Sequence, residues 1–372
     1  RDAQESRGLG DVYKRQSVYC YMLAGLMLSA SSCSSWLSED DAPVMSYDYY
    51  ETEAGVNAAI TAAYGFLRWG VGGERFDVLT ELGTDLFTEG EDGSNRESYN
   101  KYATQLNPDD GILYEMWENH YKGISDANIA MQKIRDSQDL LESVKIQSYA
   151  EMQFIRAYLY FDLVQQFGRI PLVTEGSFEI RTDFKRAPIA DVYNVIISDL
   201  RNAAENLPEK ASVLGRATRY SAAHLLAKVY LTRGSAVKDA RGQKATDMDS
   251  TLYYAEQVIN SGAYSLQENF SSLWDIKNQG NSETVFAVQF TTEPMFNGDG
   301  NKQHLYWLSW YEDQPGMLRD IENGRPFRRH VATKKTMDDL YDRLHDSRFY
   351  KSFKWVYYAN NVNTLPVWES LS

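Results

Sequence analysis

Cysteine is almost absent from this chain of 372 residues, with only Cys20 and Cys33, both in the first tenth. The rest of the chain can therefore contain neither a disulfide nor a thiolate metal site. Histidine is also rare, and its five residues lack the spacing of metal ligands. The glycine-rich and nucleophile motifs of common hydrolases and nucleotide-binding enzymes are missing as well. These absences predict a protein that is not an enzyme and holds no metal or cofactor.

Positive charge is scarce relative to negative charge. There are 38 Lys and Arg against 52 Asp and Glu, a net charge of -14. Nucleic acids and anionic membrane surfaces both attract basic proteins, so neither is expected as a partner. Aromatic residues are plentiful, with 26 Tyr and 8 Trp. Such a composition suits a protein that stacks flat rings on ligands, and it suits a large helical core equally well.

The N-terminus has the features of a secretion signal. Residues 1–16 start without Met and show no apolar period, so we expect them to be an artefact outside the fold. Residues 17–33 contain an apolar run that is too short to span a bilayer as a helix. Their last four residues, Ala30-Ser31-Ser32-Cys33, resemble a bacterial lipobox, which implies that Cys33 is acylated. An ordinary signal peptide with an incidental cysteine is the alternative.

Residues 34–262 read as a helical region. Apolar residues recur at a spacing of three and four, and Gly or Pro ends each periodic stretch. This pattern predicts helices at Thr52–Trp69, Gly111–Asp136, Tyr149–Gly168, Ile189–Leu207, Thr218–Gly234 and Asp249–Ser261. Helices of this length joined by short polar turns are similar to degenerate tetratricopeptide repeats, stacked as a solenoid of helix pairs. Asn128 and His224 are expected to be core residues of this region.

In residues 263–372 the helical periodicity gives way to loop-type composition, which predicts a loop-rich, ligand-binding lobe. Two short strands are expected, at Glu283–Phe290 and Phe353–Tyr358, together with a short helix at Met337–Leu344. The fold class is therefore mainly α, a solenoid of helix pairs carrying an irregular lobe with a few short strands.

Several blocks in order resemble the SusD/RagB family of nutrient-binding lipoproteins. The clearest is RAYLYFDLVQQFGRIPLV, at Arg156–Val173. It is accompanied by WLSEDDAP, WENHYKGISDANIAMQKI, GRATRYSAAHLLAKVYLTRG, YYAEQVINSGAYSL, SETVFAVQF and the pair Asp346–Arg348. The resemblance implies a lipid-anchored protein at the surface of the outer membrane of a Gram-negative bacterium. It also implies glycan ligands and a SusC-like TonB-dependent transporter as partner. Members of the family continue further, so we expect a fragment that lacks its C-terminal part.

Sugar binding by stacking needs exposed rings with polar groups at their rim. Two loop segments have this composition, and their positions match those from which the family draws its stacking residues. The candidate ligand-binding residues are Asp85, Arg96, Tyr99, Asn100 and Tyr102 in the first segment and Tyr306, Trp307, Trp310 and Tyr311 in the second. The second segment could equally be a buried strand or an interface. In the first, Glu89, Glu91, Asp92 and Asn95 could instead hold calcium, although the ordered spacing of an EF-hand is missing.

The sequence thus predicts capture of oligosaccharides without catalysis and their delivery to a transporter. One alternative is a helical-repeat lipoprotein that binds peptides or proteins. A second is a secreted glycosidase, because the separation of two carboxylates decides that mechanism and the sequence hides it.

Overall fold

The computed structural model describes residues 52–90, 96–102, 106–177, 179, 181–237, 241–293, 298, 300–354 and 356–365. All of these residues belong to one compact unit, residues 50–372. The predicted signal at residues 17–33 and the lipidation site Cys33 lie outside the described residues. Of the helices described, none has both the length and the hydropathy needed to cross a membrane.

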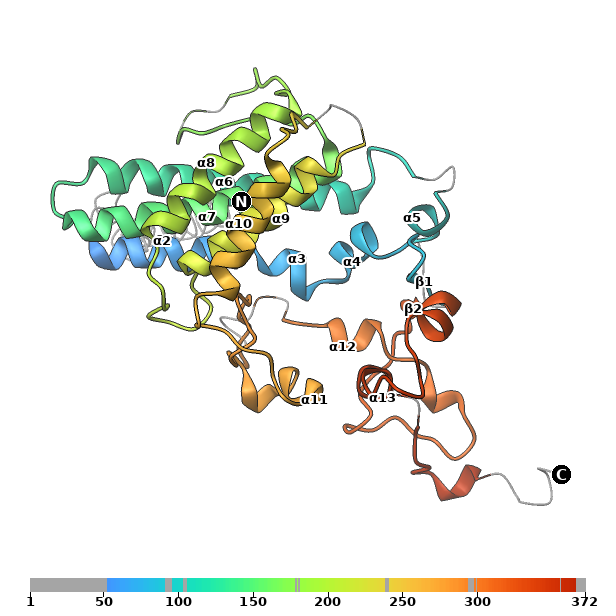
Figure 1. Ribbon diagram of the computed structural model, residues 1–372. Helices are drawn as coiled ribbons and strands as arrows, with labels where there is room; N and C mark the ends of the chain where they lie inside the picture. The colour runs from blue at the N-terminus through green and yellow to red at the C-terminus, as the bar shows by residue number, and fades with distance from the viewer. Residues whose placement is uncertain are drawn as a thin grey trace, which may run out of the picture. The chain divides into compact units, whose positions relative to one another are not determined.

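Long helices form the first part of this unit, which confirms the prediction of a mainly α fold. They are α2 (Glu53–Gly65), α6 (Gly111–Asp136), α7 (Glu142–Phe167), α8 (Ile189–Asn206), α9 (Arg219–Gly234) and α10 (Asp247–Ile259). From α6 to α10 each helix packs on the next, and α2 packs on α6 and α7 (Figure 1). This arrangement buries one continuous apolar cluster that draws on α2 and on α6 to α9, and Tyr254 of α10 packs against it.

The helix boundaries follow local chemistry. The Thr52 hydroxyl accepts a hydrogen bond from the Gly55 amide at 3.1 Å, and Thr218 forms a capping box with Ser221. Gly168 ends α7 with a φ of 69°, a conformation that costs glycine little. The prediction of one helix over Thr52–Trp69 was wrong in one respect. The chain breaks after α2, and a separate short helix α3 (Arg68–Gly72) follows.

Helix α7 is buried along most of its length and carries a polar cluster into the core. The Arg156 guanidinium forms two hydrogen bonds of 2.8 Å with the Asp199 carboxylate of α8. It also donates to the Asn128 side chain at 2.7 Å and to the Thr174 carbonyl at 3.0 Å. Asn128 donates in turn to the Val173 carbonyl at 2.9 Å, so the expectation of a satisfied core residue is confirmed. These bonds fix the segment that follows α7 onto the helices.

The chain between α2 and α6 consists of short elements. After α3 come α4 (Glu74–Thr80), strand β1 (Phe87–Glu89) and α5 (Glu97–Lys101). Val78, Leu82 and Tyr99 form a small apolar cluster of their own. This stretch carries the first predicted ligand-binding segment.

The lobe after α10 contains only short elements among the described residues. They are α11 (Phe270–Leu273), η2 (Ile276–Asn278), α12 (Gln303–Tyr306), η3 (Tyr311–Asp313), β2 (His330–Ala332), the π-helical turn η4 (Lys335–Asp339), α13 (Arg348–Ser352) and η5 (Val362–Thr364). The predicted helix at Met337–Leu344 overlaps η4, but η4 begins earlier, at Lys335, and ends earlier, at Asp339.

The strand predictions in the lobe were wrong. Residues 283–290 and the described part of 353–358 are irregular, and the observed sheet pairs β1 with β2. In the first of these stretches, side chains from the helical region take the place of a neighbouring strand. The Val285 carbonyl accepts from the Ser221 hydroxyl at 3.1 Å, and the Gln289 carbonyl accepts from Arg68 at 2.9 Å.

Candidate functional site

The structure brings the two predicted ligand-binding segments together. Strands β1 and β2 pair antiparallel, with Phe87 opposite Ala332 and Glu89 opposite His330. The Gly90 amide donates to the Arg329 carbonyl at 2.8 Å, which extends the ladder by one bond. The rings of Phe87 and Trp307 meet edge to face, with centroids 4.8 Å apart. Two stretches more than 200 residues apart in sequence therefore form one local structure.

In the first segment, most of the predicted side chains are engaged with the protein itself. Asp85 is exposed and forms an ion pair with Lys335. Arg96 is 12% exposed and pairs with Glu74. Tyr99 is buried, and burial raises the pKa of its hydroxyl. The Asn100 side chain accepts from the Gly83 and Glu89 amides and thereby shapes the loop before β1. Tyr102 is the exposed ring of this set, at 69%.

The second segment is a one-turn helix followed by a 3-10 turn, not a strand. Tyr306 and Tyr311 are buried, and Tyr311 donates to the Gly324 carbonyl at 2.6 Å and stacks on Tyr357. Trp307 and Trp310 are half-buried. Trp307 donates to the Gln303 side chain at 3.0 Å. The ligand-binding role of the nine residues stays a prediction, and the side chains with accessible rings are Tyr102, Trp307 and Trp310.

A group of titratable side chains lies beneath this junction. His330 is 1% exposed, and its Nε2 atom is 3.7 Å from the Asp77 carboxylate. Removal from water favours the neutral form of both groups. It lowers the pKa of His330 to about 4 and raises the pKa of Asp77 to about 6. A cluster of His, Cys, Asp or Glu able to hold a metal ion is not found within the described part of the chain.

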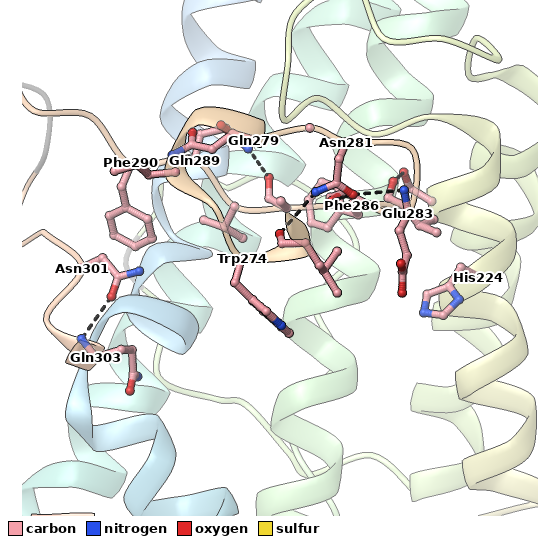
Figure 2. A pocket seen from close by; sticks show the side chains of 18 of the residues that line it. His224, Trp274, Gln279, Asn281, Glu283, Phe286, Gln289, Phe290, Asn301 and Gln303 are labelled. Carbon is pink, nitrogen blue, oxygen red and sulfur yellow. Dashed lines mark hydrogen bonds between the residues drawn. The ribbon is translucent and has the colours of Figure 1, made fainter. Parts of the chain in front are cut away.

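A cavity of about 1240 Å³ lies between α7, α9 and the lobe segments around residues 273–290 and 301–304. Figure 2 shows His224 and Glu283 at one side of this cavity, Asn301 and Gln303 at the other, and Trp274 between them. Trp274 is 71% exposed. Gln303 and His304 line the cavity at the point where the second predicted segment begins. The cavity is thus continuous with that segment.

The cavity wall combines apolar rings with polar groups, as ligand sites commonly do. The Phe286 ring packs edge to face on Phe154 of α7 at 5.2 Å, so this wall is anchored in the helical core. Glu283 accepts a hydrogen bond from the Gln267 amide at 2.8 Å. His224, expected in the core, is instead exposed and faces the cavity, because α9 turns this side of the helix away from its neighbours.

Sequence reasoning missed Trp274 and His224 as lining residues. His224 follows two buried alanines on α9, so its apolar surroundings in sequence favoured the core. Trp274 stands in a short turn after α11, where no periodicity indicates a face. A signal was present in its type, since a large ring in a polar turn (Trp274-Asp275) is unusual.

A family model described as "Starch-binding associating with outer membrane", of the SusD-like kind, matches residues 44–231. The match covers half of the chain. The chain belongs to the SusD-like family. The helix-pair solenoid predicted for this fold class is thereby confirmed, together with the resemblance noted in the sequence.

Individual relatives agree with this assignment. SusD-like protein P2 of Formosa agariphila is 29% identical over 341 residues, which cover 84% of this chain and 63% of that protein. A solved structure, a laminarin binding SusD-like protein, superposes with a TM-score of 0.67 at 25% identity, covering 81% of this chain and 66% of the other. Another, described with xylogluco-oligosaccharide, has a TM-score of 0.60 at 22% identity, with coverages of 76% and 54%, and shows the shared fold. The chain spans about three fifths of the length of the Formosa protein.

Proposed function

We propose that this protein captures oligosaccharides without changing them chemically and delivers them to a TonB-dependent transporter in the outer membrane. The proposal includes acylation of Cys33, which would hold the protein at the cell surface. The supporting family description names starch binding and the outer membrane, and one related structure is described as laminarin binding.

The observation that carries the proposal is the cavity that joins Trp274 to the second predicted segment. Pyranose rings present C–H faces that pack on flat aromatic rings, while their hydroxyls need amide, carboxylate and guanidinium partners. Trp274 offers an exposed ring, and Asn301, Gln303 and His304 offer polar groups at the opposite wall. A volume of about 1240 Å³ exceeds the range of about 300–1,000 Å³ that suits a single drug-sized ligand. The space therefore suits a chain of several sugar units.

We place the remaining contacts on the rings that are accessible in the two segments. Trp307, whose indole N–H donates to Gln303, would extend the site beyond Gln303, and Tyr102 and Trp310 would add further contacts. The buried rings Tyr306 and Tyr311 would support these residues from below. Asp85, Arg96 and Asn100 would affect ligand binding indirectly, because their contacts with the protein fix the conformation of the loops around β1.

A glycan panel tests the proposal. The full chain is run in affinity gels that contain starch, laminarin or xyloglucan, and release of reducing sugar is followed in the same samples. We expect retardation by one polysaccharide class and no product. Released product would contradict the non-catalytic part of the proposal. Retardation by none of the polysaccharides, with a folded protein, would favour the alternative of a peptide-binding lipoprotein.

A further inference from the structure

Glu74 lies between the two segments that carry the predicted ligand-binding residues. It is the first residue of α4 and is only 6% exposed. One of its carboxylate oxygens pairs with Arg96 and the other with Arg329. Arg96 stands at the start of α5 in the first segment, and Arg329 directly precedes β2. One buried carboxylate therefore joins residues that are 22 and 255 positions away from it in sequence.

The ion pair between Glu74 and Arg96 fixes the conformation of the loop that carries Tyr102. Arg96 precedes α5 (Glu97–Lys101), and its carbonyl accepts from the Tyr99 and Asn100 amides at 3.0 Å each. Asn100 then holds the Gly83 and Glu89 amides through its side-chain oxygen. A shift of Arg96 would therefore move α5 and the end of β1 together.

The ion pair between Glu74 and Arg329 fixes the position of the second segment. The Arg329 amide donates to the Tyr306 carbonyl at 2.8 Å, and its carbonyl accepts from the Gly90 amide at 2.8 Å. Its guanidinium lies over the rings of Tyr306 and Phe327, at 5.5 and 4.8 Å from their centroids. Arg329 thus contacts the helical turn that precedes Trp307 and, at the same time, the residue that follows β1.

The Glu74 carboxylate lies between two positive charges. Two guanidinium groups directed at the same buried point repel each other, and interactions between charges are strong where water is excluded. Asp77 and His330 also lie close to this point, and burial drives both toward the neutral form. Tyr306 lies against Arg329 and is not expected to ionise, because burial raises its pKa. Glu74 therefore offsets part of the repulsion between the two arginines.

We infer that Glu74 is a positioning residue for the ligand site: it holds Arg96 and Arg329 together so that the two segments act as one binding surface. The inference rests on the proposed function for its affinity readout. Without the Glu74 charge, the segments would separate for part of the time, and the apparent affinity would fall in proportion to the population that remains joined.

The test compares Glu74→Gln with Glu151→Gln in the full chain. Glu151 is a matched control because it is also buried, at 2% exposure, and also faces an arginine, Arg216, at 3.6 Å. It lies within the helical region, where it accepts from the Tyr64 hydroxyl at 2.8 Å. Affinity is measured for whichever of starch, laminarin and xyloglucan the unaltered protein binds. Amide exchange is measured at Gly90 and Arg329 and, for reference, in α7.

We expect E74Q to bind about tenfold more weakly and to lose protection at Gly90 and Arg329 by a similar factor, with α7 unchanged. E151Q should lower the melting temperature while keeping affinity and the protection of both amides. Equal loss of affinity in the two variants, or unchanged protection at Gly90 and Arg329 in E74Q, would overturn the inference. Should E74Q fail to fold, Arg96→Gln, which removes one of the two pairs, is measured in the same way.

The two proposals fail in different ways. If the unaltered protein binds none of the polysaccharides, the proposed function is contradicted, and the exchange data alone decide the role of Glu74. If the unaltered protein binds and E74Q does not open at β1 and β2, the inference is wrong and the proposed function stands.

Discussion

The helical region and the lobe use opposite means to hold their chains in place. From α2 to α10, apolar residues at helical spacing merge into one continuous core, and buried charges such as Arg156 and Asp199 are bonded inside it. In the lobe and in the stretch between α2 and α6, segments far apart in sequence are joined by pairs of contacts, such as Phe87 with Trp307 or Glu74 with Arg329.

This difference shows where stability and where binding reside. A continuous core spreads the cost of any one change over many neighbours, and its stability is largely independent of surface loops. Loops joined by a few pairs place accessible rings and polar groups on a surface, at low local stability.

Breaking the buried ion pair of the helical region should have the largest effect. In Asp199→Ala, Arg156 loses two of its four hydrogen bonds while it remains 5% exposed. Removing one partner of a buried pair typically costs about 3–5 kcal/mol. Urea unfolding should show that the free energy of unfolding falls by this amount. A loss below about 1 kcal/mol, the range of an exposed pair, would contradict this account of the core.

Truncating one phenylalanine in each region tests the contrast directly. Phe161 of α7 and Phe349 of α13 are 2% and 4% exposed, so they are matched in burial. Phe161→Ala should cost about 3–5 kcal/mol, because the surrounding helices cannot close the cavity. Phe349→Ala should cost less than Phe161→Ala, because its neighbours Tyr350 and Phe353 can collapse into the space. Equal losses in urea unfolding would show that the lobe is packed as rigidly as the helices.

The pair His330 and Asp77 predicts opposite pH dependences for two variants. The folded protein holds an extra proton on Asp77 between about pH 4 and 6, so this group makes stability fall as pH rises. His330, with a folded pKa of about 4, lacks a proton that the unfolded chain binds, so it makes stability rise up to about pH 6.5. In the unaltered protein the two slopes offset each other.

Removing either group should therefore unmask the other. The stability of Asp77→Asn should rise between pH 4 and 6.5, and that of His330→Gln should fall between pH 4 and 6, each by about 1–3 kcal/mol. Urea unfolding at several pH values measures both slopes. Slopes of the same sign in the two variants would contradict the assignment of the two protonation states.

Removing the N-cap of α9 should have the smallest effect on stability. Thr218→Ala removes the hydroxyl that accepts from the Ser221 amide at 3.2 Å, and loss of such a cap costs about 1 kcal/mol. A matched Thr218→Ser variant keeps the oxygen and should lose less. Thermal unfolding distinguishes the two, and an equal loss in both would assign the effect to the methyl group of Thr218.

How well each region could be predicted follows from the same contrast. Helix α6 begins and ends where the spacing of its apolar residues placed it, because a helix is specified by neighbours three and four residues apart. The stretch Glu283–Phe290 has the composition of a buried strand, but whether it becomes one depends on a partner strand elsewhere in the chain. β1 and β2 were not foreseen, because three residues each carry no pattern of their own.

The sequence selected two segments by composition, and it could not assign the roles of their residues. That the structure joins the two segments follows from long-range contacts such as the pairing of β1 with β2. Which rings are accessible depends on long-range contacts, such as that of Tyr311 with Tyr357. Arg96 looked like a group for sugar hydroxyls, and its pairing with Glu74 could not be read from a local pattern.

The polysaccharide affinity of two tryptophan variants tests whether the lobe binds the glycan at its exposed rings. Trp274→Ala and Trp310→Ala are compared with Tyr253→Ala, which removes a ring that is 58% exposed on α10 outside the cavity. We predict that each tryptophan variant keeps the far-UV circular dichroism spectrum of the unaltered protein. Each should bind at least about tenfold more weakly, which corresponds to a loss of about 1.4 kcal/mol in binding free energy. Tyr253→Ala should bind as the unaltered protein does. Unchanged affinity in both tryptophan variants would contradict the placement of the site in the lobe.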